Sequence, residues 1–242
     1  MTCTKSALFC ELLLTAVAAR AGSSGTLAEA EEDIIAHFAQ IRSCAAVITT
    51  VETAESGDGA TARAETQRRI EWMRKGDGFF YRAESKARTT RTTGGAGTTE
   101  ETTATTVSDG VQVVTLSERN GEKKATRRKA DVTTIPDIRT MLNELRKDHV
   151  LSRRSDLTVG VDDCYVIQVT PKDLQGSEIS HTVIYFRKDI GLDVRTVVYG
   201  KNNKPIYTST TTDIRLNPDL TPDRFVVVLP EGVKLEDQTD QR

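Results

Sequence analysis

The sequence predicts a mainly β protein with helices (α+β), built on an antiparallel sheet. Between Tyr165 and Leu229, apolar and polar side chains alternate in several short segments, as they do in strands with two unlike faces. Turn-forming residues such as Gly200–Asn203 separate these segments. The links are too short for crossover helices, so neighbouring strands should run antiparallel. Both faces carry bulky apolar residues, and such a sheet has to be covered or curled.

At the N-terminus, residues 1–21 are predicted to be a cleaved export signal. Lys5 gives the positive start, Ala7–Ala19 the apolar run, and Ala19–Arg20–Ala21 an A-x-A cleavage site. A short amphipathic helix is the alternative interpretation. The run is too short and too interrupted to span a membrane, so no stable membrane insertion is expected. We therefore expect a periplasmic product in which residues 22–242 form a single domain.

Two segments predict amphipathic helices. The first covers Thr26–Ser43 and begins with a capping box formed by Thr26 and Glu29. The second covers Pro136–His149, with Pro136 near the first helical position. Each helix has one apolar face to bury. The apolar positions at helical spacing are Leu27, Ile34, Phe38 and Ile41 in the first helix, and Ile138, Met141, Leu142 and Leu145 in the second.

The remaining segments predict strands and turns. An aromatic hairpin, containing Trp72, Phe79 and Tyr81, is expected around the turn Gly76–Gly78. Val107–Gly110 should be a turn between two β segments. The other predicted strands are Ala45–Val51, Thr66–Lys75, Phe79–Ser85, Val111–Leu116, Cys164–Thr170, Thr182–Phe186, Leu192–Tyr199, Ile206–Ile214 and Phe225–Leu229, the last ending at Pro230.

Two polar stretches predict solvated loops. Residues 89–106 are of low complexity, with ten Thr among eighteen residues, and predict a Thr-rich loop or mobile hairpin. Residues 119–129 are strongly basic. No aromatic residue is interleaved with these charges, so a solvated loop is favoured over a nucleic-acid patch.

Composition and motifs favour a binding protein over an enzyme. The chain has 33 basic and 35 acidic residues, which leaves no electrostatic footprint for nucleic acid. Its three histidines are scattered, and no catalytic, metal-binding or nucleotide-binding motif occurs. We expect no catalytic residue, no metal and no cofactor. Cys44 and Cys164 remain after signal removal and either form a disulfide in an oxidising compartment or are two buried thiols.

The order of these segments resembles the periplasmic lipoprotein carriers of the LolA type, the outer-membrane lipoprotein-sorting proteins. The matching features are the aromatic–basic strand and turn from Trp72 to Tyr81, the turn at Val107–Gly110, and the ending at Asp223–Gln238. That ending is similar to the family's F-x-F-x-x-P-x-G-V-x-x-x-D close. The resemblance covers nearly all of residues 22–242, and the ending is its most specific part.

The resemblance implies a strongly curved antiparallel sheet, an unclosed barrel, with the helices on its concave side as a lid. It implies a monomeric periplasmic carrier that binds acyl chains of lipoproteins or lipids in a hydrophobic cavity. The carrier would take its cargo from an inner-membrane donor protein to an outer-membrane acceptor protein. The alternative is a periplasmic sensor or regulator, similar to the sigma-regulator relatives, that binds a protein or lipidic signal with the same fold.

The resemblance also implies which residues form the site. In the family an Arg at the end of the aromatic–basic strand hydrogen-bonds to the lid, and here that residue is Arg74 or Lys75. The other candidates line or cap the hollow, and an ordinary collapsed core is the alternative. The full set of candidates is Leu27, Ile34, Phe38, Trp72, Arg74, Lys75, Phe79, Tyr81, Met141 and Leu142.

Overall fold

The structure, a computed structural model, describes residues 25–55, 59–76, 78–94, 96–130, 138–175 and 177–238. The export signal predicted for residues 1–21 and the start of the second predicted helix at Pro136 lie outside these ranges. In the described residues, the chain forms two α-helices, one short 3-10 helix and twelve strands.

All twelve strands belong to one sheet, which is not closed. Its order from edge to edge is β12-β6-β5-β4-β3-β2-β1-β11-β10-β9-β8-β7. Every neighbouring pair is antiparallel except β12 and β6, which are parallel. The elements are α1 (Leu27–Ala39), β1 (Ser43–Glu55), β2 (Thr61–Lys75), β3 (Gly78–Thr93), β4 (Ala96–Ser108), β5 (Gln112–Arg119), β6 (Glu122–Lys129), α2 (Ile138–Asp148), β7 (His149–Val159), β8 (Asp162–Pro171), β9 (Ile179–Arg187), β10 (Asp193–Gly200), β11 (Pro205–Leu216), η1 (Pro222–Phe225) and β12 (Leu235–Asp237).

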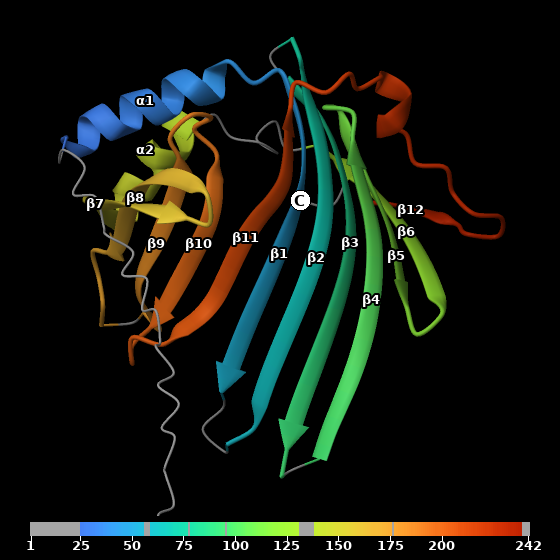
Figure 1. Cartoon of the computed structure of the whole chain (residues 1–242). Helices are drawn as coiled ribbons and strands as arrows, with labels where there is room; N and C mark the ends of the chain where they lie inside the picture. The colour runs from blue at the N-terminus through green and yellow to red at the C-terminus, as the bar shows by residue number, and fades with distance from the viewer. Residues whose placement is uncertain are drawn as a thin grey trace, which may run out of the picture.

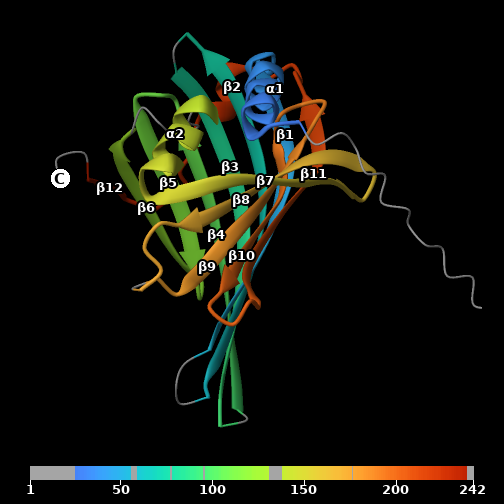
Figure 2. The same cartoon turned by 90° about the vertical axis from the view of Figure 1, so that its left-hand side faces the viewer.

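The sheet is strongly bent, and both helices lie on its concave side, near the end of the strands where β1 begins (Figures 1 and 2). In Figure 2 the β7–β8 end and the β5–β6 end curve toward the same side, with α2 between them. We call the concave side the inner face and the convex side the outer face. The predicted fold class, a curved and unclosed antiparallel sheet with helices over its hollow, is therefore confirmed.

The helix α1 begins as predicted and ends earlier. Thr26 Oγ1 accepts a hydrogen bond from Glu29 N at 3.2 Å, and Glu29 Oε2 accepts one from Thr26 N at 2.6 Å. This reciprocal capping box satisfies two backbone donors at the helix N-terminus. The helix ends at Ala39, not at Ser43, because Ser43 already pairs with Met73 in the sheet.

The main core lies between the two helices and the inner face. Its most deeply buried members come from both helices and from β1, β2, β8 and β9, so the helices cover the inner face from the middle of the sheet toward its β7 edge. These members include Ile34, Phe38, Trp72, Leu142, Ile167 and Phe186.

A second, smaller cluster forms on the outer face, where the C-terminal segment crosses the sheet. Phe225 in η1 packs on Phe80 at 5.4 Å between ring centroids, beside Val107. The predicted strand Phe225–Leu229 is therefore wrong: Phe225 is buried in a 3-10 turn, and Val228 after it is 86% exposed. The chain rejoins the sheet only at β12.

Residues 89–106 form a hairpin, one of the two alternatives that the sequence offered, whereas the loop predicted for residues 119–129 is wrong. Residues 89–106 belong to the long hairpin β3–β4, and most of residues 119–129 belong to β5–β6. Thr is β-branched and suits a strand, and cross-strand pairs of Thr hydroxyls hold the ladder together. Two such pairs, Thr90–Thr99 and Thr106–Thr115, each have oxygens 3.2 Å apart. Charged side chains on strands next to solvent do not prevent pairing.

The strand β7, which forms one edge of the sheet, was not predicted from the sequence. Its residues include Arg153, Arg154 and Asp156 and lack a clear alternation. Charged side chains are common on edge strands, because they discourage pairing with other chains.

Cys44 and Cys164 are buried free thiols. They lie on β1 and β8, which are separated in the sheet by β11, β10 and β9. Burial raises the pKa of both thiols to about 11, and nearby Asp162 contributes to the shift at Cys164. The interpretation as two buried thiols, left open by the sequence, matches this arrangement.

We predict that both cysteines of the chain lacking residues 1–21 react slowly with a disulfide reagent in the native state. At about pH 8 their raised pKa values leave little thiolate, which is the reactive form. In denaturant without reductant, two thiols per chain should then react. A denatured chain with no reactive thiol would instead show that the two cysteines are paired.

Candidate functional site

The candidate site is the inner face under α1 and α2, together with the undersides of these helices. Most of the predicted residues meet there. Ile34, Phe38, Trp72 and Leu142 are buried in the main core, and Leu27, Phe79, Tyr81 and Met141 are half-buried against it. Arg74 joins them through the contacts described next. Lys75 ends β2, and its side chain lies outside the described part of the structure.

A row of aromatic rings joins the lid to the sheet. The rings of Phe38 and Trp72 have centroids 6.0 Å apart, and those of Trp72 and Phe79 are 5.6 Å apart in an edge-on arrangement. The Arg74 guanidinium lies 5.3 Å from the Phe38 ring centre and 5.0 Å from that of Phe79. Such cation–π contacts contribute about 0.5–2 kcal/mol, with the larger values where water is excluded. Arg74 thus sits between the lid and the sheet.

Arg74 also holds the chain just after α1. Its Nε donates to the Ile41 carbonyl oxygen at 2.8 Å, and its backbone N donates to the Arg42 carbonyl oxygen at 2.8 Å. The segment between α1 and β1 is therefore fixed to β2 by one residue. The resemblance expects an arginine here to hydrogen-bond to the lid itself, whereas Arg74 bonds to Ile41, two residues after α1 ends.

The other end of α1 is held by Arg153 from the edge strand β7. Arg153 Nη1 donates to the Thr26 carbonyl oxygen at 3.2 Å, and its Nη2 lies 3.0 Å from Asp156 Oδ1. Lys188 lies 2.8 Å from the other oxygen of the same carboxylate. The Arg153 side chain is only 11% exposed, so this arrangement is more rigid than a surface ion pair. Sequence reasoning missed this contact, because no motif or periodicity marks Arg153.

A third polar contact lies between these two ends. The Tyr165 hydroxyl donates to Asp33 Oδ2 at 2.6 Å. Arg153 and Lys188 lie 5.1 Å and 5.0 Å from the centre of the Tyr165 ring. Burial and the hydrogen bond to Asp33 raise the pKa of Tyr165 to about 12, so the phenol stays neutral and keeps donating to the lid at physiological pH.

The two helices are also linked to each other. Arg139 is ion-paired with Glu32 at 3.0 Å, and Arg146 with Glu31. Exposed pairs of this kind contribute about 0–1 kcal/mol. Glu31 is only 7% exposed, so losing its ion pair with Arg146 would cost more than losing an exposed pair, because a buried carboxylate without a cation is unfavourable.

Gly191, in the turn between β9 and β10, lets α1 come close to the sheet. Its φ is +68°, a conformation that side chains disfavour. A Cβ at this position would lie 2.2 Å from the Ile34 carbonyl oxygen and 2.9 Å from Phe38 N. The backbone of α1 therefore packs directly against this glycine. The turn was predicted from the sequence, but its contact with α1 was not.

Away from the helices, the inner face becomes polar. Following β2 from Trp72, the next inward positions are Ile70, Arg68 and Thr66, and the strands beside it contribute mainly Ala, Ser and Thr at the paired inward positions. Arg68 forms a hydrogen bond with Tyr81, whose own pKa is raised by burial. The inner face thus has an apolar part beneath the lid and a hydroxyl-lined part with a cation beside it.

Two further findings concern the described residues. None of their His, Cys, Asp and Glu side chains form a group of three or more that could hold a metal ion. None of their helices has the length and apolar character needed to cross a bilayer.

Among the comparisons with known proteins, one solved structure supports the fold. No protein-family model and no curated protein matches the sequence. Among solved structures, an uncharacterized conserved protein from Thermus thermophilus is similar, with 10% identity and a TM-score of 0.53, covering 87% of this chain and 98% of that one. MucB aligns with 12% identity and a TM-score of 0.42, covering 83% and 62% of the two chains. A LolA-superfamily protein from Nitrosomonas europaea aligns with 12% identity and a TM-score of 0.29, covering 84% and 99%.

The first of these scores supports a shared fold, and the other two are too low to carry an argument. Because the identity to the first structure is only 10%, this comparison shows the fold and no specific family.

We predict that Arg74→Gln loosens the lid. The change removes a partly buried, charged hydrogen bond of the kind that contributes about 1.5–3 kcal/mol. Hydrogen exchange of the α1 amides should become roughly tenfold faster or more, while exchange in β8 changes little. The control is Arg63→Gln, which removes an exposed arginine from the outer face of the same strand. Equal acceleration in α1 and β8 would contradict a local role for Arg74.

A second prediction concerns Gly191. Gly191→Ala should lower the free energy of unfolding more than Gly160→Ala does, as measured by urea denaturation. Both glycines have positive φ, at +68° and +64°, so both variants lose about 1–2 kcal/mol from backbone strain. Only Gly191 faces the helix backbone, since nothing lies within 4 Å of a Cβ at Gly160. The clash should add about 1–3 kcal/mol. Equal losses would show that α1 is not seated on this turn.

Proposed function

We propose that this protein is a periplasmic carrier that binds the acyl chains of lipoproteins or lipids between its inner face and the underside of α1 and α2. The observation that supports this most directly is how the lid is held. Its apolar underside covers the inner face, while its two ends are fixed by single arginines, Arg74 and Arg153. A helix fixed in this way can separate from the sheet by breaking few polar contacts, although its apolar packing must also be replaced.

The energetics are compatible with exchange between the lid and a cargo. Exposing a fully buried apolar side chain costs about 1.5–3 kcal/mol, so lifting Ile34, Phe38 and Leu142 costs roughly 5–9 kcal/mol. Each methylene of an acyl chain buried in their place contributes about 0.8 kcal/mol. A chain of about six to eleven methylenes therefore offsets the cost.

The polar part of the inner face adds to this proposal. An amphiphile would place its apolar chains beneath the lid and its polar end toward Arg68 and the hydroxyl-lined strands. The proposed route is from an inner-membrane donor protein to an outer-membrane acceptor protein, with the carrier acting as a monomer. The second candidate, a sensor or regulator that binds a protein or lipidic signal, would use the same face.

We predict that Met141→Glu weakens binding of a fluorescent long-chain fatty acid at least tenfold. Met141 is half-buried on the lid underside, so a carboxylate there puts charge beside the bound chain with less damage to the core than at Phe38, which is 3% exposed. The control, Val228→Glu, places the same charge at an 86% exposed valine on the outer face and should bind normally. Urea unfolding of both variants checks that the sheet is intact.

Mass spectrometry of chloroform extracts of the protein purified from its own periplasm distinguishes the two candidates. Stoichiometric lipid or lipopeptide supports the carrier. A clean extract, together with no fatty-acid binding and a tight protein partner in a pulldown, would overturn it in favour of the regulator.

A further inference from the structure

A groove of about 570 Å³ crosses the outer face of the sheet, on the side opposite the lid. It runs over β1, whose outward residues here are the small Ala45 and Val47. The strands on either side contribute charged residues that rise above this low floor. Those lining the groove are Arg69 and Glu71 of β2, Arg82 and Glu84 of β3, Asp213 and Arg215 of β11, and Arg224 of η1.

The groove depends on a β-bulge in β11. Pairing between β1 and β11 shifts register between Ala45 and Val47, and Asp213 has a φ of +52° at this point. A bulge adds a residue to one strand and redirects the side chains around it, and bulges are common beside binding sites. Here it places Asp213 and Arg215 along the same side of the groove.

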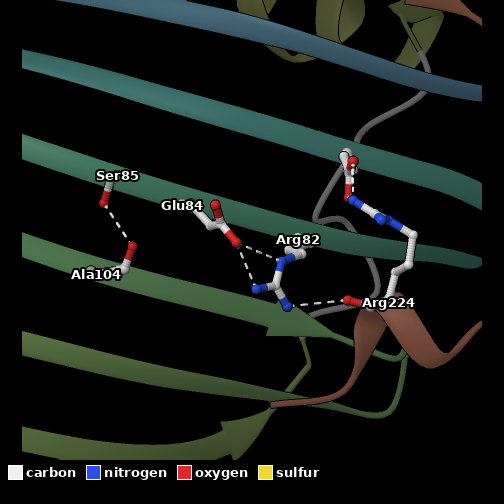
Figure 3. Close-up of polar contacts among 6 residues, drawn as sticks. Arg82, Glu84, Ser85, Ala104 and Arg224 are labelled. Carbon is white, nitrogen blue, oxygen red and sulfur yellow. Dashed lines mark hydrogen bonds and ion pairs between the residues drawn. The ribbon is translucent and has the colours of Figure 1, made fainter. Parts of the chain in front are cut away.

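The C-terminal segment closes one end of the groove. Arg224 makes an ion pair with Glu71, with Nη2 and Oε1 2.6 Å apart, and the Glu71 side chain is 14% exposed. The Arg224 carbonyl oxygen accepts a hydrogen bond from Arg82 Nη1 at 3.2 Å, while Arg82 also pairs with Glu84 at 2.6 Å (Figure 3). These contacts fix Arg82 and Arg224, and each already has a carboxylate partner.

Arg69 and Arg215 differ from these two arginines. Within the described residues neither has a carboxylate partner, although both line the groove. In the sheet they lie on either side of β1, with Arg69 opposite Val47 and Arg215 opposite Ala45. The groove also contains Asp213. Its four arginines and three carboxylates together leave a surplus of one positive charge.

We propose that this groove binds a small molecule carrying a phosphoryl or sulfate group, held by Arg69 and Arg215. The planar fork of a guanidinium donates two parallel hydrogen bonds to such an oxyanion, and two arginines from different strands can hold it from both sides. The small side chains of the floor allow the ligand to approach the sheet. The volume is within the range of pockets that hold small organic ligands.

This site is separate from the acyl site. Ala45 and Val47 point outward, whereas their neighbours Cys44 and Ala46 point into the main core beneath the helices. The two proposals therefore stand or fall independently, since a ligand in the groove does not touch the lid.

The test uses inorganic pyrophosphate as a probe, followed by NMR of the ¹⁵N-labelled chain. We expect saturable shifts confined to the amides around residues 45–47, 69–71 and 213–215. The double variant Arg69→Gln/Arg215→Gln should weaken binding at least tenfold. The matched control, Arg63→Gln/Arg88→Gln, removes the same charge from outward positions on β2 and β3 outside the groove and should bind like the unchanged protein.

A third variant, Arg69→Lys/Arg215→Lys, keeps the charge and removes the forks. We expect it to bind with intermediate strength, and unchanged NMR spectra elsewhere show that it is folded. Absence of saturable binding, shifts spread over all basic surfaces, or an equal loss in the control would each overturn the proposal.

Discussion

The contact on which the rest of this structure depends is the burial of the α1 underside against the inner face of a bent sheet. An antiparallel sheet of this width has too many apolar inward residues to remain uncovered. Ile34 and Phe38 pack in one core with Trp72 on β2 and Phe186 on β9, so one helix covers the inner face from the middle of the sheet toward the β7 edge. The bend of the sheet and the position of α1 therefore depend on each other. Without α1 the apolar inner face would be exposed, and without the bend α1 would contact fewer strands.

Polar contacts decide where that helix lies, while apolar packing supplies most of its stability. The hydrogen bonds from Arg74, Arg153 and Tyr165 act at the end, the start and the middle of the lid. The three donors lie on different strands, β2, β7 and β8. A lid fixed at separate points can be released at one end while the other stays attached, which suits a protein that must take up a bulky chain and later release it.

The sequence was informative where the pattern is local. The capping box at Thr26, the alternation in β8 to β11 and the aromatic hairpin at Trp72 each depend on neighbours in the chain, and each was predicted correctly. The errors arose where distant partners decide the outcome. Thr-rich strands form because β2 and β5 flank them, and Phe225 leaves the strand pattern because Phe80 buries it on the outer face.

The site shows the same division. Residues with helical or strand periodicity were correctly expected to lie between the helices and the sheet. The sequence left the choice between Arg74 and Lys75 open. Arg153 and Gly191 were not found, because their role comes from a helix far away in the sequence. The outer groove was missed for a similar reason, since Arg69 and Arg215 lie on strands more than a hundred residues apart along the chain.

The short parallel pairing of β12 has a consequence for the edge of the sheet. The chain's own C-terminal strand occupies Ala125–Arg127, the middle of β6. It thereby covers backbone groups of β6 that would otherwise be open to pairing with a strand of another chain. The C-terminal segment thus protects this edge against intermolecular pairing, in addition to packing on the outer face.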